Sequence, residues 1–232
     1  MLPIKDTIRS RSVPLVNWLF ILANLLVFLY ELSLPSLRLE QFIYQYGLVP
    51  ANLNLANPLT WGPLFTHMFL HGGWLHILSN LWILFIFGDN VEDRLGSGRY
   101  VLFYMVGGIV AGLVQIYFSM DALTPSIGAS GAIAAVLGGY FSFYPRSKVI
   151  TLIPIFIIPW FVELPSFIFL GFWFITQLYQ GLISLGTSAG QAVGGVAWWA
   201  HIGGFVFGLL FVRMFAIGRA NPRWYSDQYW PW

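Results

Sequence analysis

Apolar segments long enough to cross a lipid bilayer recur along the whole chain. A membrane-spanning helix needs about 20 mainly apolar residues, because the hydrocarbon core is about 30 Å thick. The segments therefore predict an all-α polytopic membrane protein. Six of them qualify as transmembrane helices: 13–33, 72–89, 100–120, 127–144, 165–185 and 196–217.

The composition fits a bilayer better than water. Of the 232 residues, 58% are hydrophobic and 9% are charged, whereas a soluble domain carries about 25% charged residues. The net charge of +2 is too small to indicate a nucleic-acid partner. The sequence has no cysteine, which excludes disulfides, a thiolate nucleophile and cysteine-ligated metals. We expect an integral multi-pass protein of the plasma (inner) membrane that needs no cofactor.

Two further stretches bear on the organisation of the chain. The N-terminus, "MLPIKDTIRSRSVPLVNW", is basic and then apolar, without a small-residue cleavage site, so we interpret it as leading into a retained first span. Residues 149–162 are apolar but short, and they contain Pro154 and Pro159. This pattern favours an interfacial or re-entrant loop over a seventh span. With no repeat and no long charged linker, residues 1–232 are expected to form one membrane domain.

The basic residues predict the orientation of the bundle. With six spans, ten of the eleven Lys and Arg residues fall on one side, and Arg38 alone falls on the other. Because cytoplasmic loops carry the excess of Lys and Arg, both termini should be cytoplasmic, with tails at 1–12 and 218–232. The loops 34–71, 121–126 and 186–195 should then face outward.

This topology brings unusual polar residues to one depth. Spans 72–89, 127–144 and 196–217 all enter from the outer side, and each carries polar groups near its entry: His76 and Asn80, Ser130, and His201. His76 and Asn80 share a helix face because they are four residues apart. Polar residues inside a membrane are costly and are functional candidates by default.

Small residues indicate that the spans bearing Ser130 and His201 touch. Small side chains at four-residue spacing let helix backbones approach closely in lipid. On one span Ser130, Ala134 and Gly138 form such a stripe. On the other span His201, Gly204 and Gly208 share a face, and Gly204 and Gly208 are the small pair four residues apart.

A serine within reach of a histidine predicts nucleophilic catalysis. A neutral imidazole can remove the hydroxyl proton near pH 7, which assigns Ser130 as nucleophile and His201 as general base. No carboxylate accompanies the pair, since Asp121 lies in an outer loop nine residues before the serine. The sequence therefore predicts a dyad and not a triad.

Other groups are placed to stabilise the oxyanion of the tetrahedral intermediate. His76, Asn80 and the backbone N–H of Ser130 can donate hydrogen bonds to the developing charge. Gly128 and Gly131 frame the serine, permitting a tight backbone and leaving space for a substrate carbonyl.

Each element of this constellation also has a structural interpretation. A Gly-x-Ser-Gly pattern or a lone histidine in a span often serves only helix packing. The polar residues of "HILSN" can likewise form hydrogen bonds that only hold helices together. His67, His71 and His76 lack the HExxH pattern or carboxylate of a familiar metal site, so no metal is expected. A transporter would show ionisable groups along a whole pathway. The joint occurrence on three spans of one direction favours a hydrolase.

At this point the sequence resembles the rhomboid family of intramembrane serine proteases. The resemblance rests on "FTHMFLHGGWLHILSNLWILFIFGDNVEDRLGSGRY", "IGASGAIAAVLGGYFSFYPR" and "GGVAWWAHIGGFVFG", which with the six spans cover most of residues 60–215. It implies a six-transmembrane-helix rhomboid bundle.

The resemblance also implies roles for individual residues. Ser130 resembles the nucleophile and His201 the general base, His76 and Asn80 resemble the oxyanion-stabilising pair, and Gly128 and Gly131 match the motif glycines. His71 matches a further histidine at the outer end of its span. Two positions depart from patterns seen in some members: Gly62 follows Trp61 where an arginine would stand, and Ala134 replaces a tyrosine on which the catalytic histidine rests.

The implied function is hydrolysis of transmembrane segments of membrane proteins. A substrate helix must unwind locally before attack because its amides are bonded internally, which favours Gly, Ala or Pro near its outer end. Movement of span 165–185 is a route for substrate entry, and the glycine-rich loop 186–195 is a lid or a plain connector. The alternative is a catalytically silent rhomboid-like protein that binds membrane clients; such relatives lack the serine or the histidine.

Overall fold

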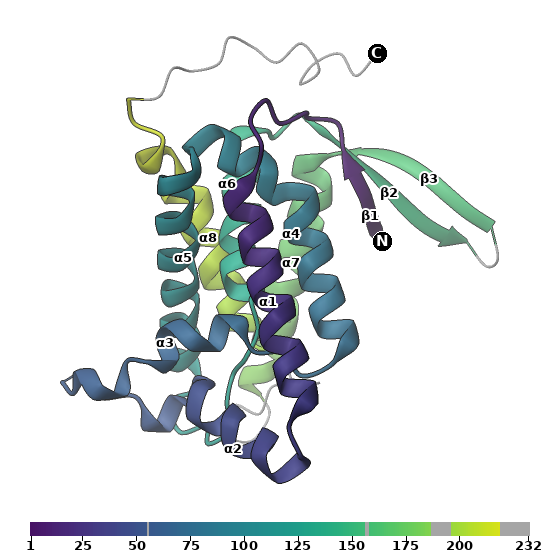
Figure 1. Ribbon diagram of the computed structural model, residues 1–232. Helices are drawn as coiled ribbons and strands as arrows, with labels where there is room; N and C mark the ends of the chain where they lie inside the picture. The colour runs from purple at the N-terminus through teal and green to yellow at the C-terminus, as the bar shows by residue number, and fades with distance from the viewer. Residues whose placement is uncertain (55, 156–157, 187–195, 219–232) are drawn as a thin grey trace.

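The computed structural model describes residues 1–54, 56–155, 158–186 and 196–218. Within these ranges the chain forms eight α-helices and three β-strands (Figure 1). Short 3-10 turns connect some of them. In chain order the elements are β1 (Leu2–Asp6), α1 (Leu15–Ser33), α2 (Ser36–Tyr46), α3 (Pro63–Thr66), α4 (Trp74–Leu95), α5 (Ser97–Phe118), α6 (Ser130–Phe143), β2 (Lys148–Ile155), β3 (Ile158–Pro165), α7 (Ser166–Leu185) and α8 (Trp198–Phe215).

Five of the described helices are long and apolar enough to cross a membrane, namely α1, α4, α5, α7 and α8. The prediction of a polytopic helical membrane protein is therefore confirmed in its mostly helical character and in the presence of several candidate spans. Helix α6, expected as a span over 127–144, has only 14 residues and is shorter than the others. At a rise of 1.5 Å per residue, α6 is about 21 Å long.

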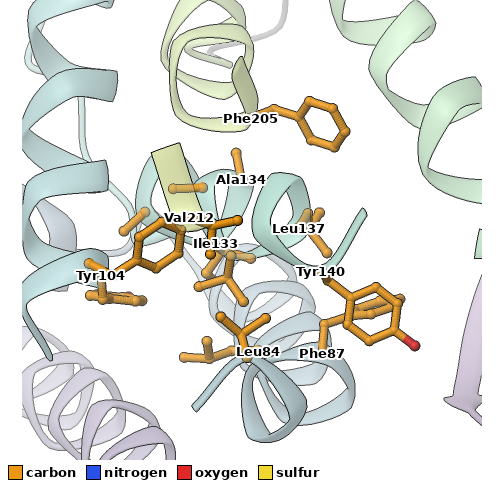
Figure 2. Close-up of a cluster of buried hydrophobic side chains, with 14 of the residues drawn as sticks. Leu84, Phe87, Tyr104, Ile133, Ala134, Leu137, Tyr140, Phe205 and Val212 are labelled. Carbon is orange, nitrogen blue, oxygen red and sulfur yellow. The ribbon is translucent and has the colours of Figure 1, made fainter. Parts of the chain in front are cut away.

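Helix α6 is the most enclosed element of the bundle. Every residue from Gly131 to Tyr140 is buried, and side chains from several other helices surround it (Figure 2). A helix that is covered by other helices on all sides needs no lipid-facing surface, so it can be short. Its neighbours in this core include Leu84, Phe87, Tyr104, Phe205 and Val212.

Small residues bring α6 against α8, as the sequence predicts. A Cβ added to Gly138 would collide with the carbonyl of Phe205, and one added to Gly208 would collide with the carbonyl of Ala135. Gly204 meets the carbonyl of Gly131 in the same way. This backbone-to-backbone contact fixes the position of the first turns of both helices, where Ser130 and His201 lie.

The three strands correct the prediction of an all-α chain. The described residues of 149–162, a segment expected as an interfacial or re-entrant loop, belong to the antiparallel strands β2 and β3. Strand β1, which lies in the segment expected as an N-terminal tail, pairs with β2. Figure 1 shows this sheet at the end of the bundle where α1 begins. Periodicity alone cannot distinguish a strand from a buried helical segment in a short apolar run. The β-branched residues of this run favour the strand.

A buried carboxyl group joins the sheet to the helices. Asp6 of β1 accepts hydrogen bonds from the hydroxyl of Tyr140 at 2.6 Å and from the amide of Asn90 at 2.9 Å. Burial raises the pKa of the Asp6 carboxyl to about 8, although the bond from Tyr140 acts in the opposite direction. The Asp6 carboxyl, whose raised pKa favours its neutral form, therefore attaches β1 to α4 and α6.

Several polar contacts place loops of basic character at one end of the bundle. The guanidinium of Arg99 donates to the carbonyl of Ile217 at 2.7 Å, and that of Arg213 donates to the carbonyl of Ser142 at 2.7 Å. Ser12 donates to the carboxylate of Asp93 at 2.5 Å. The start of α1, the α4–α5 junction and the ends of α6 and α8 thus lie together.

Candidate active site

At the end of the bundle opposite the basic loops, the first residue of α6 lies against the first turn of α8. The Oγ atom of Ser130 lies 2.7 Å from Nε2 of His201. Gly128 adopts a φ of +125°, and its N–H donates to the carbonyl of His67 at 2.9 Å. This turn ends the preceding loop and lets α6 begin at the serine, so the pair expected from the sequence is brought into hydrogen-bond contact.

The second ring nitrogen of His201 has a partner that the sequence analysis missed. Its Nδ1 lies 2.8 Å from Oε1 of Gln177 on α7. The amide nitrogen of Gln177 faces other acceptors, Oγ1 of Thr176 at 3.1 Å and the carbonyl of Trp173 at 3.3 Å. The amide oxygen accepts only, so these partners assign the proton to Nδ1 and leave Nε2 free to accept from the serine hydroxyl.

Two tryptophans flank the imidazole in place of a residue from α6. The ring centroid of Trp173 lies 6.0 Å from that of His201 at an interplanar angle of 32°, and Trp198 lies at 6.1 Å and 85°. Ala134 is fully buried, and its Cβ lies close to Gly204. The aromatic neighbours of His201 therefore come from α7 and α8.

His76 lies beside Gly128, two residues before the serine. Its Nδ1 accepts the backbone N–H of Gly72 at 3.3 Å, so Nε2 carries the proton and is the donor. A Cβ added to Gly128 would lie 2.6 Å from Nε2 of His76 and 3.7 Å from Oγ of Ser130. The imidazole donor and the serine hydroxyl thus flank the same glycine.

Asn80, one turn after His76 on α4, pairs with His71, which lies just before that helix. The side-chain nitrogen of Asn80 lies 3.0 Å from Nε2 of His71, whose ring is 5.1 Å from that of His76. Burial, with a smaller contribution from His76, lowers the pKa of His71 to about 4. Glu31 of α1, which the sequence analysis also missed, accepts the backbone N–H of His71 at 3.2 Å. His71 therefore orients the Asn80 amide and is tied to α1.

The two motif glycines have different surroundings. Gly131 packs against α5, since an added Cβ would lie 2.7 Å from Cβ of Ala111. Gly131 also borders a small cavity beside the serine, with room for about one water molecule. The polar groups lining this cavity are His67, Gln115, Ser126 and Ser130.

Two further expectations concern the surroundings of the site. Apart from Gly186, the segment interpreted as a lid or connector, 186–195, lies outside the described residues. Within the described part of the chain, no three His, Asp or Glu residues are grouped as ligands for a metal ion. His201 contacts Ser130 directly as a hydrogen-bond acceptor, and the donor His76 lies beside Gly128.

Comparisons with known proteins agree on one family. The model of the Rhomboid domain matches residues 58–217, which is more than half of the chain. A putative rhomboid protease of Bacillus subtilis, YdcA, is 32% identical over 130 residues, covering 56% of this chain and 62% of the relative. The rhomboid protease GlpG of Salmonella typhimurium is 33% identical over 136 residues, covering 59% of this chain and 46% of the relative. The chain thus matches about half of the length of these relatives.

Proposed function

We propose, from the premise that this chain belongs to the rhomboid family, that it is an intramembrane serine endopeptidase. The observation that carries the proposal is the 2.7 Å contact between Ser130 Oγ and His201 Nε2. The relatives that it resembles are named as rhomboid proteases. Its substrates are transmembrane segments of other membrane proteins.

In the proposed acylation step, Oγ of Ser130 attacks the scissile carbonyl carbon while Nε2 of His201 takes the hydroxyl proton. The tetrahedral intermediate collapses, the C–N bond breaks, and the amine leaves with the proton held by His201. The N-terminal part of the substrate remains as an ester on Ser130. A water molecule then attacks the ester while His201 takes its proton; the bond to Oγ of Ser130 breaks, His201 returns the proton to Oγ, and the new carboxyl end of the substrate leaves.

The proposed oxyanion donors are Nε2–H of His76, the amide of Asn80 and the backbone N–H of Ser130. His76 flanks Gly128 together with the serine, and Asn80 has one amide hydrogen left after bonding His71. Fixed donors of this kind stabilise charge that develops only in the transition state. The small polar cavity beside Ser130 offers a place for the hydrolytic water.

For the membrane topology we propose six spans, with the short α6 as the enclosed one, and both termini in the cytoplasm. The contacts that gather the basic loops at one end of the bundle support this arrangement, because such loops mark the cytoplasmic side. Residues 1–232 then form a single rhomboid domain of the plasma (inner) membrane. The site faces outward, where water reaches it.

The test is cleavage of a single-span substrate by the purified protein in detergent. Ser130→Ala and His201→Ala should each reduce cleavage to background, and the double variant should lose little more because the two groups act as one unit. Full activity of Ser130→Ala would reject the assignment. Binding of the substrate without cleavage by the wild-type protein would favour the client-binding alternative.

A further inference from the structure

We propose that Gln177 is a positioning residue for His201 and that it makes the chemistry depend on the seating of α7 against α8. This inference rests on the proposed function. It starts from the 2.8 Å contact between Oε1 of Gln177 and Nδ1 of His201. Gln177 is on α7, whereas the serine and the histidine are on α6 and α8.

The amide of Gln177 is held in one orientation. The side chain is 6% exposed, and its nitrogen donates to Thr176 and to the carbonyl of Trp173. A flip would direct an N–H at Nδ1 and bring the amide oxygen against the carbonyl of Trp173 and against Oγ1 of Thr176, whose own proton is donated to that carbonyl at 2.6 Å. The oxygen is therefore fixed toward His201, which keeps the proton on Nδ1 and the lone pair on Nε2.

This arrangement helps the reaction when the imidazole becomes charged. After Nε2 takes the proton of Ser130, both ring nitrogens carry protons, and the Nδ1–H bond to Gln177 becomes a charge-assisted hydrogen bond. In a Ser-His-Asp triad a carboxylate does this orienting. A neutral amide does it here without the cost of a buried unpaired charge in the resting enzyme.

The position of α7 decides whether the contact exists. One turn after Gln177, Gly181 packs against α8, since an added Cβ would lie 3.0 Å from Cδ1 of Ile202 and 3.5 Å from Trp199. Trp173, one turn before Gln177, adds its ring beside the imidazole. Any displacement of α7 from α8 removes the acceptor and this ring together, so His201 is oriented only when α7 is seated.

The first experiment compares variants of Gln177 by turnover of a single-span substrate and by melting temperature. Gln177→Leu and Gln177→Met remove the acceptor and should lower kcat about 10- to 100-fold, with KM within about twofold because substrate binding is retained. Gln177→Glu keeps an acceptor and should stay within about threefold of wild type. The matched control is Ser184→Ala, which removes a buried hydroxyl group from the same helix and should not change kcat.

The variants also separate positioning from structural loosening. If kcat follows the presence of the acceptor at similar melting temperatures, the proposal holds. If kcat follows the melting temperature in all three variants, or if Gln177→Leu and Gln177→Met turn over like wild type, the proposal is wrong. As a second readout, the imidazole 15N shifts of His201, assigned by their loss in His201→Ala, should report a single Nδ1-protonated form in wild type and a mixture in Gln177→Leu.

The dependence on α7 is tested by a double-mutant cycle. Gly181→Val pushes α7 away from Ile202 and should lower kcat in the wild-type background, but only weakly in Gln177→Leu, because the contact is already lost. Equal losses in both backgrounds would contradict the coupling. Ser130→Ala separates this result from the proposed function: if Ser130→Ala is inactive and Gln177→Leu is fully active, only the positioning role fails.

Discussion

Replacing Gly128 by alanine tests whether the position of His76 matters for catalysis. The backbone of Gly128 has a φ of +125°, a region that costs a side-chain-bearing residue about 1–3 kcal/mol. The new Cβ would lie 2.6 Å from Nε2 of His76, so the ring must move. That movement weakens the 3.3 Å bond from Gly72, worth about 0.5–1.5 kcal/mol. Together these effects predict a loss of about 1.5–4.5 kcal/mol in the free energy of unfolding.

The catalytic effect should exceed what unfolding explains. A displacement of about 1 Å at a reacting group can cost about 100-fold in rate, so cleavage per folded Gly128→Ala molecule should fall by about that factor. Gly73→Ala is the matched control: Gly73 has a φ of +152° but nothing within 4 Å of an added Cβ. It should lose stability and keep its turnover.

The assay measures substrate cleavage and the folded fraction on the same samples. Normal turnover by folded Gly128→Ala would refute the reasoning, because it would mean that the site tolerates a displaced His76. An equal loss of turnover in Gly73→Ala would also refute it, since backbone strain alone would then account for the effect.

Three other predictions concern pH, the oxyanion and topology. The pKa of Asp6 in the folded state, about 8, lies above its ordinary value of 3.8, so the stability that it contributes is complete below about pH 4 and is lost as pH rises through 8. Melting temperature should therefore fall more steeply over this range in wild type than in Asp6→Asn, which keeps an acceptor for Tyr140; an unchanged slope in the variant would contradict this origin. Asn80→Ala should lower turnover about 100- to 1,000-fold if the amide serves the oxyanion, whereas a membrane interhelical hydrogen bond averages only about 0.6 kcal/mol of stability. A large melting shift with near-normal turnover would assign Asn80 to structure, and a deeper loss in Asn80→Ala with His76→Ala would show a shared oxyanion. Reporter fusions at both termini should report the cytoplasm, and an external C-terminal reporter would mean an odd number of spans.

The contact between Ser130 and His201 could be predicted from the sequence because it depends on local features of the two helices. Each is a costly polar residue in an apolar segment, and each begins a stripe of small residues that lets two helices approach. The collisions that a Cβ would make at Gly204 and Gly208 are the structural counterpart of that pattern.

Gln177 and Glu31 could not be found in the same way. Each stands among other polar residues of a mainly apolar helix, and nothing in its spacing relates it to His201 or to His71. Their partners depend on the rotation of α7 and α1 about their own axes, which weakly patterned helices leave undetermined.

The β-hairpin was missed for a different reason. Val149 to Val162 is apolar nearly throughout, so it shows neither the alternation of a half-buried strand nor a helical period. Its pairing with Leu2–Asp6 joins segments about 145 residues apart. Two prolines face each other across the hairpin, Pro154 and Pro159, and in the sequence they suggested a loop.

The most direct test of the account is covalent labelling of the folded protein by a fluorophosphonate, followed by mapping of the modified residue. An activated serine oxygen attacks phosphorus and expels fluoride, so the reaction needs the nucleophile and its base but no transmembrane substrate. The account predicts labelling at Ser130 in wild type and none in His201→Ala that is still folded. Labelling of another residue, or equal labelling of Ser130 in His201→Ala, would contradict the claim that these two side chains form the catalytic dyad.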